Sequence, residues 1–433
     1  MERTLMSELV NWKDNKRKKP IIINGARQVG KTWLLKEFGR KYFDNVAYVN
    51  FDNNTTMSAL FDEDYDISRL IMGIQAETGQ RITEGKTLII FDEIQECPKA
   101  LTSLKYFREN APKQMIAAAG SLLGLSTHHG TGYPVGNVTT FDLYPLNFRE
   151  FLNATSNQML RELIDGGDEA AISTFSSKIV PLLRQYYFVG GMPEAVVAFA
   201  ESGVFEDARD VQEQILLGYR RDISKHLTAS ETEFAIAAFN SIPAHLGQEN
   251  KKFVFGRIKE GARAKSFRAA ITWLAEAGLG TMVHRISKPS IPLSAYADEA
   301  SFKLYMLDIG LLGAMAGLDV NSVISGTEIF QEFKGALTEQ YVCQQLVSDC
   351  RLHPFYWSAE NSRGEIDFVV QHESKVYPIE VKAEENLRSK SLRAFNERYP
   401  DMNPRRFSLS GYREEDWMHN IPLYAIGNLR SWQ

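Results

Sequence analysis

The chain has 433 residues, of which 44% are hydrophobic and 24% charged, and its formal net charge is −5. This is an ordinary globular composition, and the length corresponds to roughly three domains of ~150 residues each. Cys97, Cys343 and Cys350 lack the paired spacing of a zinc site or a disulfide framework. No apolar run approaches the ~18 residues of a membrane-spanning helix, and the charged first twenty residues lack a signal-peptide core. These features predict a soluble, cytoplasmic protein that does not interact with a membrane.

The first informative motif lies at residues 20–38, PIIINGARQVGKTWLLKEF. An apolar run at 21–23 is typical of a buried parallel strand, and the residues from Trp33 onward have helical spacing. Between them stands G-x-x-x-x-G-K-T, the pattern of a phosphate-binding loop, in which backbone N–H groups and the helix N-terminus face an anion. The expected nucleotide-binding residues are Gly25, Ala26, Arg27, Gln28, Val29, Gly30, Lys31 and Thr32. Lys31 is expected to reach the β and γ phosphates, and Thr32 to hold Mg²⁺.

A second motif, TLIIFDE at 87–93, reads as an apolar strand that ends in two acids. This is a Walker B pattern, in which Asp92 holds Mg²⁺ through water and Glu93 orients or activates the attacking water. A further apolar run at 115–119 is followed by Ser121, either a sensor of the γ-phosphate or a plain turn serine. Strands at 21–24, 46–51, 87–91 and 115–119, with helical segments between them and a last strand in NVTTFDLYPLNF, predict an α/β nucleotide-binding sheet.

Residues 146–225 read as mostly helical and contain the turn GGMPE. A glycine pair before a proline is typical of a break between two helices. The same turn also suits a lid whose Pro193 packs on the adenine. Arg220 and Arg221 are either part of a solvated helix face or an arginine finger for a neighbouring subunit.

Residues 250–290 carry nine basic and two acidic side chains, a local charge of +7. The basic residues are Lys251, Lys252, Arg257, Lys259, Arg263, Lys265, Arg268, Arg285 and Lys288. An amphipathic helix, KSFRAAITWLAEAGL, is followed by the strand-like TMVHRISKP, which together indicate a winged helix. Such an excess of positive charge favours contact with a phosphate backbone, although it would also suit docking on an acidic protein surface.

Two strand-like runs around a polar turn, GEIDFVVQ and KVYPIEVK, predict an antiparallel hairpin. If Tyr377 lies opposite Val370, the same register places Glu380 opposite Asp367, with Lys382 on the same face. Two carboxylates that close repel each other unless a cation bridges them or one is protonated, so the hairpin predicts a metal site suited to phosphodiester cleavage. Glu339, on a small and apolar helix stripe, is a further candidate ligand. A hairpin with exposed charges is the alternative.

Together, GARQVGKT, IIFDE, LYPLNFREF, GGMPE, FKLYMLDIGLL, GALTEQYV and PIEVK resemble bacterial and archaeal AAA-type ATPases with a C-terminal domain of unknown function related to the PD-(D/E)xK nucleases. The resemblance covers nearly the whole chain. It implies ATP binding and hydrolysis at Lys31, Thr32, Asp92 and Glu93. It also implies a nuclease-like site at Glu339, Asp367, Glu380 and Lys382.

The sequence thus predicts an α/β protein of four parts. They are a P-loop ATPase core (1–150), a helical lid (151–225), a winged-helix-like part (226–298) and a nuclease-like part with a restriction-endonuclease-like α/β fold (299–433). The expected function is Mg²⁺-dependent ATP hydrolysis coupled to a metal-dependent nuclease-like domain that acts on DNA. The alternative is a nucleotide-gated switch whose C-terminal part binds nucleic acid or protein without cleaving. Chaperone-like remodelling by a ring of subunits is a third hypothesis.

Overall fold

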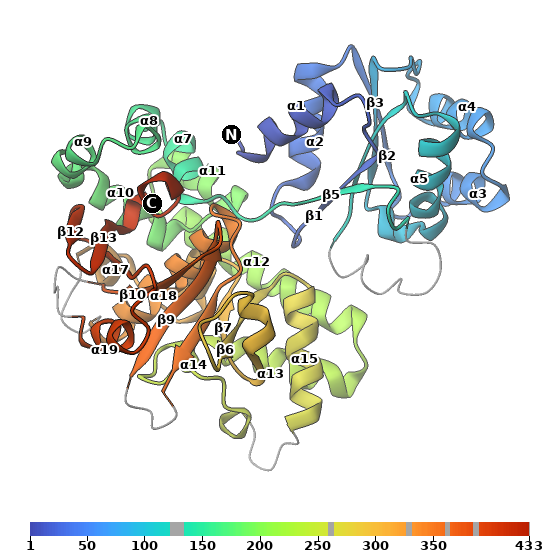
Figure 1. Ribbon diagram of the computed structural model, residues 1–433. Helices are drawn as coiled ribbons and strands as arrows, with labels where there is room; N and C mark the ends of the chain where they lie inside the picture. The colour runs from blue at the N-terminus through green and yellow to red at the C-terminus, as the bar shows by residue number, and fades with distance from the viewer. Residues whose placement is uncertain (122–133, 259–263, 326–330, 360–363, 384–388, 433) are drawn as a thin grey trace. The chain divides into compact units, whose positions relative to one another are not determined.

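The computed structural model describes residues 1–121, 134–258, 264–325, 331–359, 364–383 and 389–432 (Figure 1). Its contacts divide the chain into two compact units. The first comprises Glu2–Tyr144 with Glu276–Gly278, and the second comprises Pro145–Ala275, Leu279–Gln433 and Met1. Within the described ranges, none of the helices combines the length and the apolar character needed to cross a bilayer.

The first unit contains a five-stranded sheet in which every pairing is parallel. Its strands follow the order β2-β3-β4-β1-β5. They are β1 (Ile21–Asn24), β2 (Asn45–Asn50), β3 (Thr87–Asp92), β4 (Met115–Ala119) and β5 (Thr139–Asp142). The five predicted strands of the nucleotide-binding sheet are therefore confirmed. In a parallel sheet the carboxyl ends of the strands share one edge, which brings the two phosphate-site motifs together.

Helices cover both faces of this sheet, α1 and α2 on one side and α3 to α5 on the other (Figure 1). They are α1 (Leu5–Asp14), α2 (Lys31–Tyr42), α3 (Thr55–Glu63), α4 (Ile67–Thr78) and α5 (Pro98–Asn110). On the α3–α5 face, Phe51, Phe61 and Phe91 meet edge to face with ring centroids 5.5–5.6 Å apart. Burial on both faces explains why the strands are almost continuously apolar in sequence.

The second unit begins with helices, as the sequence predicts for 146–225. They are α7 (Phe148–Ala154), α8 (Gln158–Gly166), α9 (Glu169–Thr174), α10 (Ser176–Val189), α11 (Pro193–Ser202) and α12 (Phe205–His226). The chain enters α7 through a capping box in which Asn147 and Glu150 satisfy each other's backbone N–H groups.

The predicted winged-helix segment contains helices followed by a β-hairpin. These are α13 (Ala229–Asn240), α14 (Ile242–Leu246), α15 (Ala264–Glu276), β6 (Gly280–Ile286) and β7 (Ala297–Met306). The hairpin does not stand alone as a wing, because β6 also pairs in parallel with β8. Strand β7 spans the boundary expected at 298/299, so the hairpin continues into the C-terminal sheet.

That sheet has eight strands of mixed direction in the order β12-β13-β11-β10-β9-β8-β6-β7. The remaining strands are β8 (Phe355–Ser358), β9 (Glu365–His372), β10 (Lys375–Val381), β11 (Arg405–Ser408), β12 (Arg413–Glu415) and β13 (Met418–Pro422). The accompanying helices are α16 (Ile309–Met315), α17 (Val320–Ser325), α18 (Gln331–Ser348) and α19 (Lys390–Arg398). A mixed sheet is what the structure establishes here, and the more specific restriction-endonuclease-like fold stays a prediction.

The hairpin register expected from the sequence is confirmed, because β9 and β10 are antiparallel and Tyr377 pairs with Val370. The pairing continues to Ile379 opposite Phe368. On the other side of β9 the register against β8 shifts, so that Tyr356 alone faces Asp367 and Phe368. One extra residue on β9 opposite β8 is the pattern of a β-bulge, which bends the strand locally.

Candidate functional site

The phosphate loop connects β1 to α2 as the sequence predicts. Gly30, the residue before the helix, has a left-handed backbone with φ 94°, which glycine adopts without strain. Gly25 is required for a different reason, since a Cβ there would lie 2.4 Å from the carbonyl oxygen of Leu143. The first helical hydrogen bond runs from the N–H of Leu34 to the carbonyl of Gly30, at 2.9 Å. The strand, the loop and the helix together form the cradle of an anion site.

Lys31 lies inside this loop and is only 8% exposed. Its Nζ donates to the carbonyls of Gly25 and Ala26, at 3.0 and 2.8 Å. Burial lowers the pKa of Lys31 to about 8, while the charges of Glu93 and Asp92 oppose that shift. The ammonium therefore rests on its own loop and lies close to both Walker B acids.

Asp92 joins the two motifs at the carboxyl edge of the sheet. Its Oδ2 accepts a hydrogen bond from Thr32 Oγ1 at 2.8 Å. The hydroxyl of Tyr48, on the neighbouring strand β2, donates to the same oxygen at 2.8 Å. Burial first, and then the hydrogen bond to Asp92, raise the pKa of Tyr48, so it stays a donor. Tyr48 was missed at the sequence level, although its place in a strand beside Walker B is a usable signal.

Glu93 follows β3 with a left-handed backbone at φ 49°, which is unusual for a residue other than glycine. Its carboxylate accepts a hydrogen bond from Gln95 Nε2 at 2.5 Å, which fixes the side chain. Ser121 is buried and lies two residues after β4, the strand between β1 and β3. Its position in the chain therefore suits a group that senses phosphate between the two motifs.

The residues at this edge fit a magnesium ion. Thr32 and Asp92 offer a hydroxyl and a carboxylate oxygen, the hard ligands that Mg²⁺ takes together with phosphate oxygens and water. The two oxygens already point at each other across 2.8 Å. Lys31 beside them supplies the positive charge that a triphosphate requires.

Pro193 belongs to the second unit, whereas the phosphate loop belongs to the first, so its expected contact with adenine stays a prediction. The structure does explain the two glycines before it. The N–H of Gly191 donates to Asp308 Oδ2 at 2.6 Å, and a Cβ on Gly190 would lie 2.2 Å from Asp308 Oδ1. Asp308 is fully buried, and burial raises its pKa. The turn therefore packs around a buried carboxyl group.

The basic stretch at 250–290 is only partly surface charge. Lys251 forms an ion pair with Glu339 at 2.5 Å, and Arg285 forms one with Asp298 at 3.1 Å. Lys252 is exposed, while Lys259 and Arg263 lie outside the described residues. Of the predicted finger pair, Arg220 lies on α12 and donates to Asn240 Oδ1 at 3.2 Å.

The four residues expected to form a nuclease-like site fall into two groups. In the first, Glu339 on α18 accepts from Lys251 Nζ at 2.5 Å and from the Tyr305 hydroxyl at 3.1 Å. Lys303, which is fully buried, lies 4.0 Å from the same carboxylate and 2.5 Å from Glu365. Burial raises the pKa of Glu339, but the charges of Lys251 and Lys303 outweigh burial, so the pKa is lowered overall.

The second group is Glu380 with Lys382. Their side chains meet at 2.8 Å, as expected, with Glu380 on β10 and Lys382 directly after the end of that strand. Strand β11 places Arg406 beside Glu380. Asp367 belongs with the first group, since burial and then the charge of Glu339 raise its pKa to about 7. Its Oδ2 accepts from the N–H of Val381 at 2.8 Å.

In the structure these residues are not gathered into one group of metal ligands. Within the described ranges, no group of three or more His, Cys, Asp or Glu side chains is arranged to hold a metal ion. The expected ligand set of Glu339, Asp367 and Glu380 therefore stays a prediction. Lysines already pair with Glu339 and Glu380, and the regular pairing of β9 with β10 is recorded as far as Ile379 opposite Phe368.

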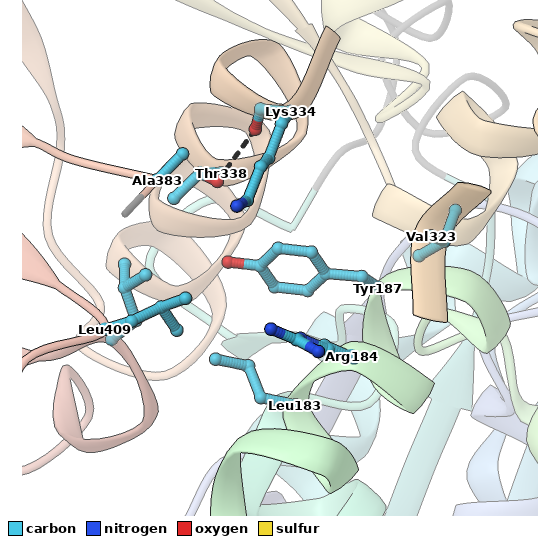
Figure 2. A pocket seen from close by; sticks show the side chains of 9 residues that line it. Leu183, Arg184, Tyr187, Val323, Lys334, Thr338, Ala383 and Leu409 are labelled. Atoms are coloured by element: carbon cyan, nitrogen blue, oxygen red, sulfur yellow. Dashed lines mark hydrogen bonds between the residues drawn. The ribbon is translucent and has the colours of Figure 1, made fainter. Parts of the chain in front are cut away.

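A small cavity of about 30 Å³ lies in the second unit, where Tyr187 points toward Thr338 and Lys334 on α18 (Figure 2). Leucine side chains line much of it, and Arg184 stands beside them. One water molecule needs on the order of 10–15 Å³ of such a cavity, so there is room for roughly two water molecules. It is too small for a nucleotide, and it contains none of the predicted site residues.

Comparison with known families supports the first site. The model of an AAA domain matches residues 17–152. Two further models, both described as domains of unknown function (DUF8612 and DUF4143), match residues 180–322 and 334–425. No curated protein matches the chain.

Several solved structures are similar over much of the chain. A Walker-type ATPase of Pyrococcus abyssi is 14% identical, with 73% of this chain and 95% of that chain covered and a TM-score of 0.44. Cdc6p of Pyrobaculum aerophilum is 13% identical, with 74% of this chain and 92% of that chain covered and a TM-score of 0.26. The RuvB Holliday junction branch migration motor of Thermotoga maritima is 13% identical, with 69% of this chain and 89% of that chain covered and a TM-score of 0.29.

The AAA match and the geometry around Lys31, Thr32 and Asp92 agree with each other. Both point to the same part of the chain, since the matched residues contain the loop, the Walker B strand and the whole parallel sheet. Residues 17–152 are therefore similar to an AAA domain, and they hold the residues of a P-loop nucleotide site.

Proposed function

We propose that the chain binds ATP with Mg²⁺ at the loop of residues 25–32 and hydrolyses its β–γ phosphoanhydride bond, which releases ADP and phosphate. The observation that carries this proposal is the meeting of Thr32 Oγ1 and Asp92 Oδ2 at 2.8 Å, beside the buried ammonium of Lys31. A P-loop ATPase needs a lysine for the phosphates, and a hydroxyl and a carboxylate for the magnesium ion.

Each residue has a role that follows from its position. The loop N–H groups bind phosphate oxygens, and Lys31 leaves the carbonyls of Gly25 and Ala26 to reach the β and γ phosphates. Magnesium, when bound at Thr32 and through water at Asp92, neutralises charge on the phosphates. Glu93 accepts the proton of the attacking water, and Ser121 donates to the γ-phosphate.

Substitution of Lys31 by alanine tests the site, with Lys41→Ala as the matched control. Lys41 lies at the other end of α2, where its side chain is 46% exposed. Lys31→Ala is expected to abolish phosphate release and calorimetric binding of magnesium-ATP, because the triphosphate loses its main counter-charge. Lys41→Ala is expected to behave like the parent protein. Unchanged turnover in Lys31→Ala would contradict the proposal.

For the second unit, the function best supported is that of a nucleotide-gated partner-binding module without cleavage. Two of its predicted metal ligands, Glu339 and Glu380, are engaged by lysines, as described above. The exposed part of the basic stretch, which includes Lys252, supports nucleic acid as the partner.

Two assays separate binding from cleavage. Fluorescence anisotropy with labelled duplex DNA, with and without ATP, is expected to show nucleotide-dependent and salt-sensitive binding. Plasmid incubated with Mg²⁺ or Mn²⁺ is expected to remain supercoiled. Metal-dependent nicking by the parent protein that disappears in both Asp367→Ala and Lys382→Ala would overturn this assignment and restore the nuclease hypothesis.

A further inference from the structure

Arg3 connects the phosphate loop to a distant part of the first unit. The side chain is 4% exposed, and its Nη1 donates to the carbonyl of Val29 at 3.0 Å. Its Nη2 donates to the carbonyl of Tyr144 at 2.5 Å. A buried guanidinium that bonds two carbonyls restrains both, because movement of either one costs a charge-assisted hydrogen bond.

Tyr144 is the point at which the chain leaves the first unit, since Pro145 begins the second. The preceding residue, Leu143, donates its N–H to the carbonyl of Asn24 at 2.8 Å. Its own carbonyl lies against Gly25, where a Cβ would approach to 2.4 Å. The exit segment of Leu143 and Tyr144 therefore contacts the start of the loop directly and its end through Arg3.

A triphosphate in the loop would act on the same backbone groups that these contacts hold. Lys31 holds the carbonyls of Gly25 and Ala26 and has to release them to reach phosphate. The Val29 carbonyl and the Gly30 N–H belong to one planar peptide group, so a carbonyl fixed by Arg3 also orients the N–H. Phosphate bound by that N–H acts on the same peptide group that Arg3 holds.

We propose that Arg3 is a positioning residue of the ATPase. It orients the peptide between Val29 and Gly30 for phosphate, and it transmits the state of the loop to the exit segment of Leu143 and Tyr144. This inference rests on the proposed function, because it requires that the loop binds a nucleoside triphosphate.

Hydrogen exchange with mass spectrometry tests the coupling, with and without Mg²⁺ and a non-hydrolysable ATP analogue. The variants are Arg3→Met, Arg3→Lys and the control Arg69→Met, which removes a surface arginine of the same unit paired with Asp64 at 2.7 Å. The two reporting peptides cover residues 25–35 and 139–146. KM and kcat are measured in parallel.

In the parent protein and in Arg69→Met, the analogue is expected to slow exchange in both peptides. In Arg3→Met we expect KM for ATP to rise about tenfold, the size of effect that loss of one charge-assisted hydrogen bond commonly has. At a saturating analogue concentration, its loop peptide is protected but the 139–146 peptide no longer responds. Arg3→Lys keeps the charge and is expected to restore part of that response.

A response of the 139–146 peptide in Arg3→Met equal to that of the parent protein would overturn the inference. So would a parent protein in which only the loop peptide responds. A parent protein whose loop peptide is not protected contradicts the proposed ATP site instead. If Arg3→Met loses protection in β3 and β4 without nucleotide, it is misfolded, and Arg3→Lys takes its place in the test. A reduced response of its 139–146 peptide to the analogue then supports the inference, and a response equal to that of the parent protein overturns it.

Discussion

Lys251 and Glu339, which are 88 residues apart in the chain, form an ion pair with Nζ and Oε1 separated by 2.5 Å. The side chains are 14% and 8% exposed, so the pair is largely removed from water. The acid that the sequence offers as a metal ligand is therefore neutralised by the protein itself. A lysine from the basic stretch thus supplies the positive charge that this buried carboxylate needs.

Replacing Lys251 by methionine leaves Glu339 with Lys303 and Tyr305 as its partners among the described residues. Breaking a buried pair from one side costs about 3 kcal/mol, because the remaining charge is uncompensated. We expect a loss of protection of that size in α18, measured by native-state hydrogen exchange. The exposed neighbour provides the control, and Lys252→Met is expected to have almost no effect. Equal effects of the two substitutions would show that Glu339 does not depend on Lys251.

The stability of the second unit is expected to depend on pH through Asp367. Burial raises the pKa of this carboxyl from 3.8 to about 7, so between these values the folded chain binds the proton more tightly than the unfolded chain. Stability therefore falls as pH rises through this window, by up to about 1.4 kcal/mol per pH unit, and levels off above pH ~7.

Urea denaturation at several pH values measures this slope, with Asp367→Asn as the comparison. The difference between the two proteins separates Asp367 from His353, whose pKa is lowered by burial and whose contribution has the opposite sign. Identical slopes in the parent protein and in Asp367→Asn would mean that Asp367 is ionised throughout the window.

Glu93 and Glu96 offer a matched pair around the Walker B strand. Glu93→Gln is expected to keep magnesium-ATP binding and to lose at least about 100-fold in turnover, because a general base contributes on the order of 10²–10⁴. Glu96 is exposed three residues later, and Glu96→Gln is expected to hydrolyse ATP normally. Single-turnover phosphate release checks both. Normal turnover in Glu93→Gln would assign the base to another group.

Tyr48→Phe removes one of the two hydrogen bonds to Asp92 Oδ2 and keeps the ring. Groups that orient a metal ligand in this way commonly change metal affinity by about tenfold or more. We expect a Mg²⁺ titration of the ATPase to shift by that factor, with kcat at saturating Mg²⁺ nearly unchanged. Tyr42, which is 38% exposed on α2, gives the control Tyr42→Phe. A titration that does not shift would make the Tyr48 hydroxyl a packing group only.

The sequence predicts correctly what depends on neighbouring residues. The strand, loop and helix around Lys31 follow from local pattern, as do the five strands of the parallel sheet. The pairing of Tyr377 with Val370 also follows, because a short polar turn leaves the hairpin few registers.

Contacts between distant segments were not predictable in this way. Tyr48 lies 44 residues from Asp92, and Arg3 lies 141 residues from Tyr144. Lys303 reads as an ordinary strand lysine, yet it is fully buried against Glu365. The bulge at Asp367 depends on the register with β8, which the hairpin alone does not contain. Each of these contacts is set by which segments meet in the folded chain.

The pairing of β6 with β8 decides how the protein can be divided for expression. A fragment that starts at residue 299 would begin inside β7 and lack β6, so β8 would lose its parallel neighbour. An unpaired strand of this kind is a template for aggregation. Recombinant pieces should therefore be cut before Pro145, so that the helices, the hairpin and the mixed sheet are produced as one polypeptide.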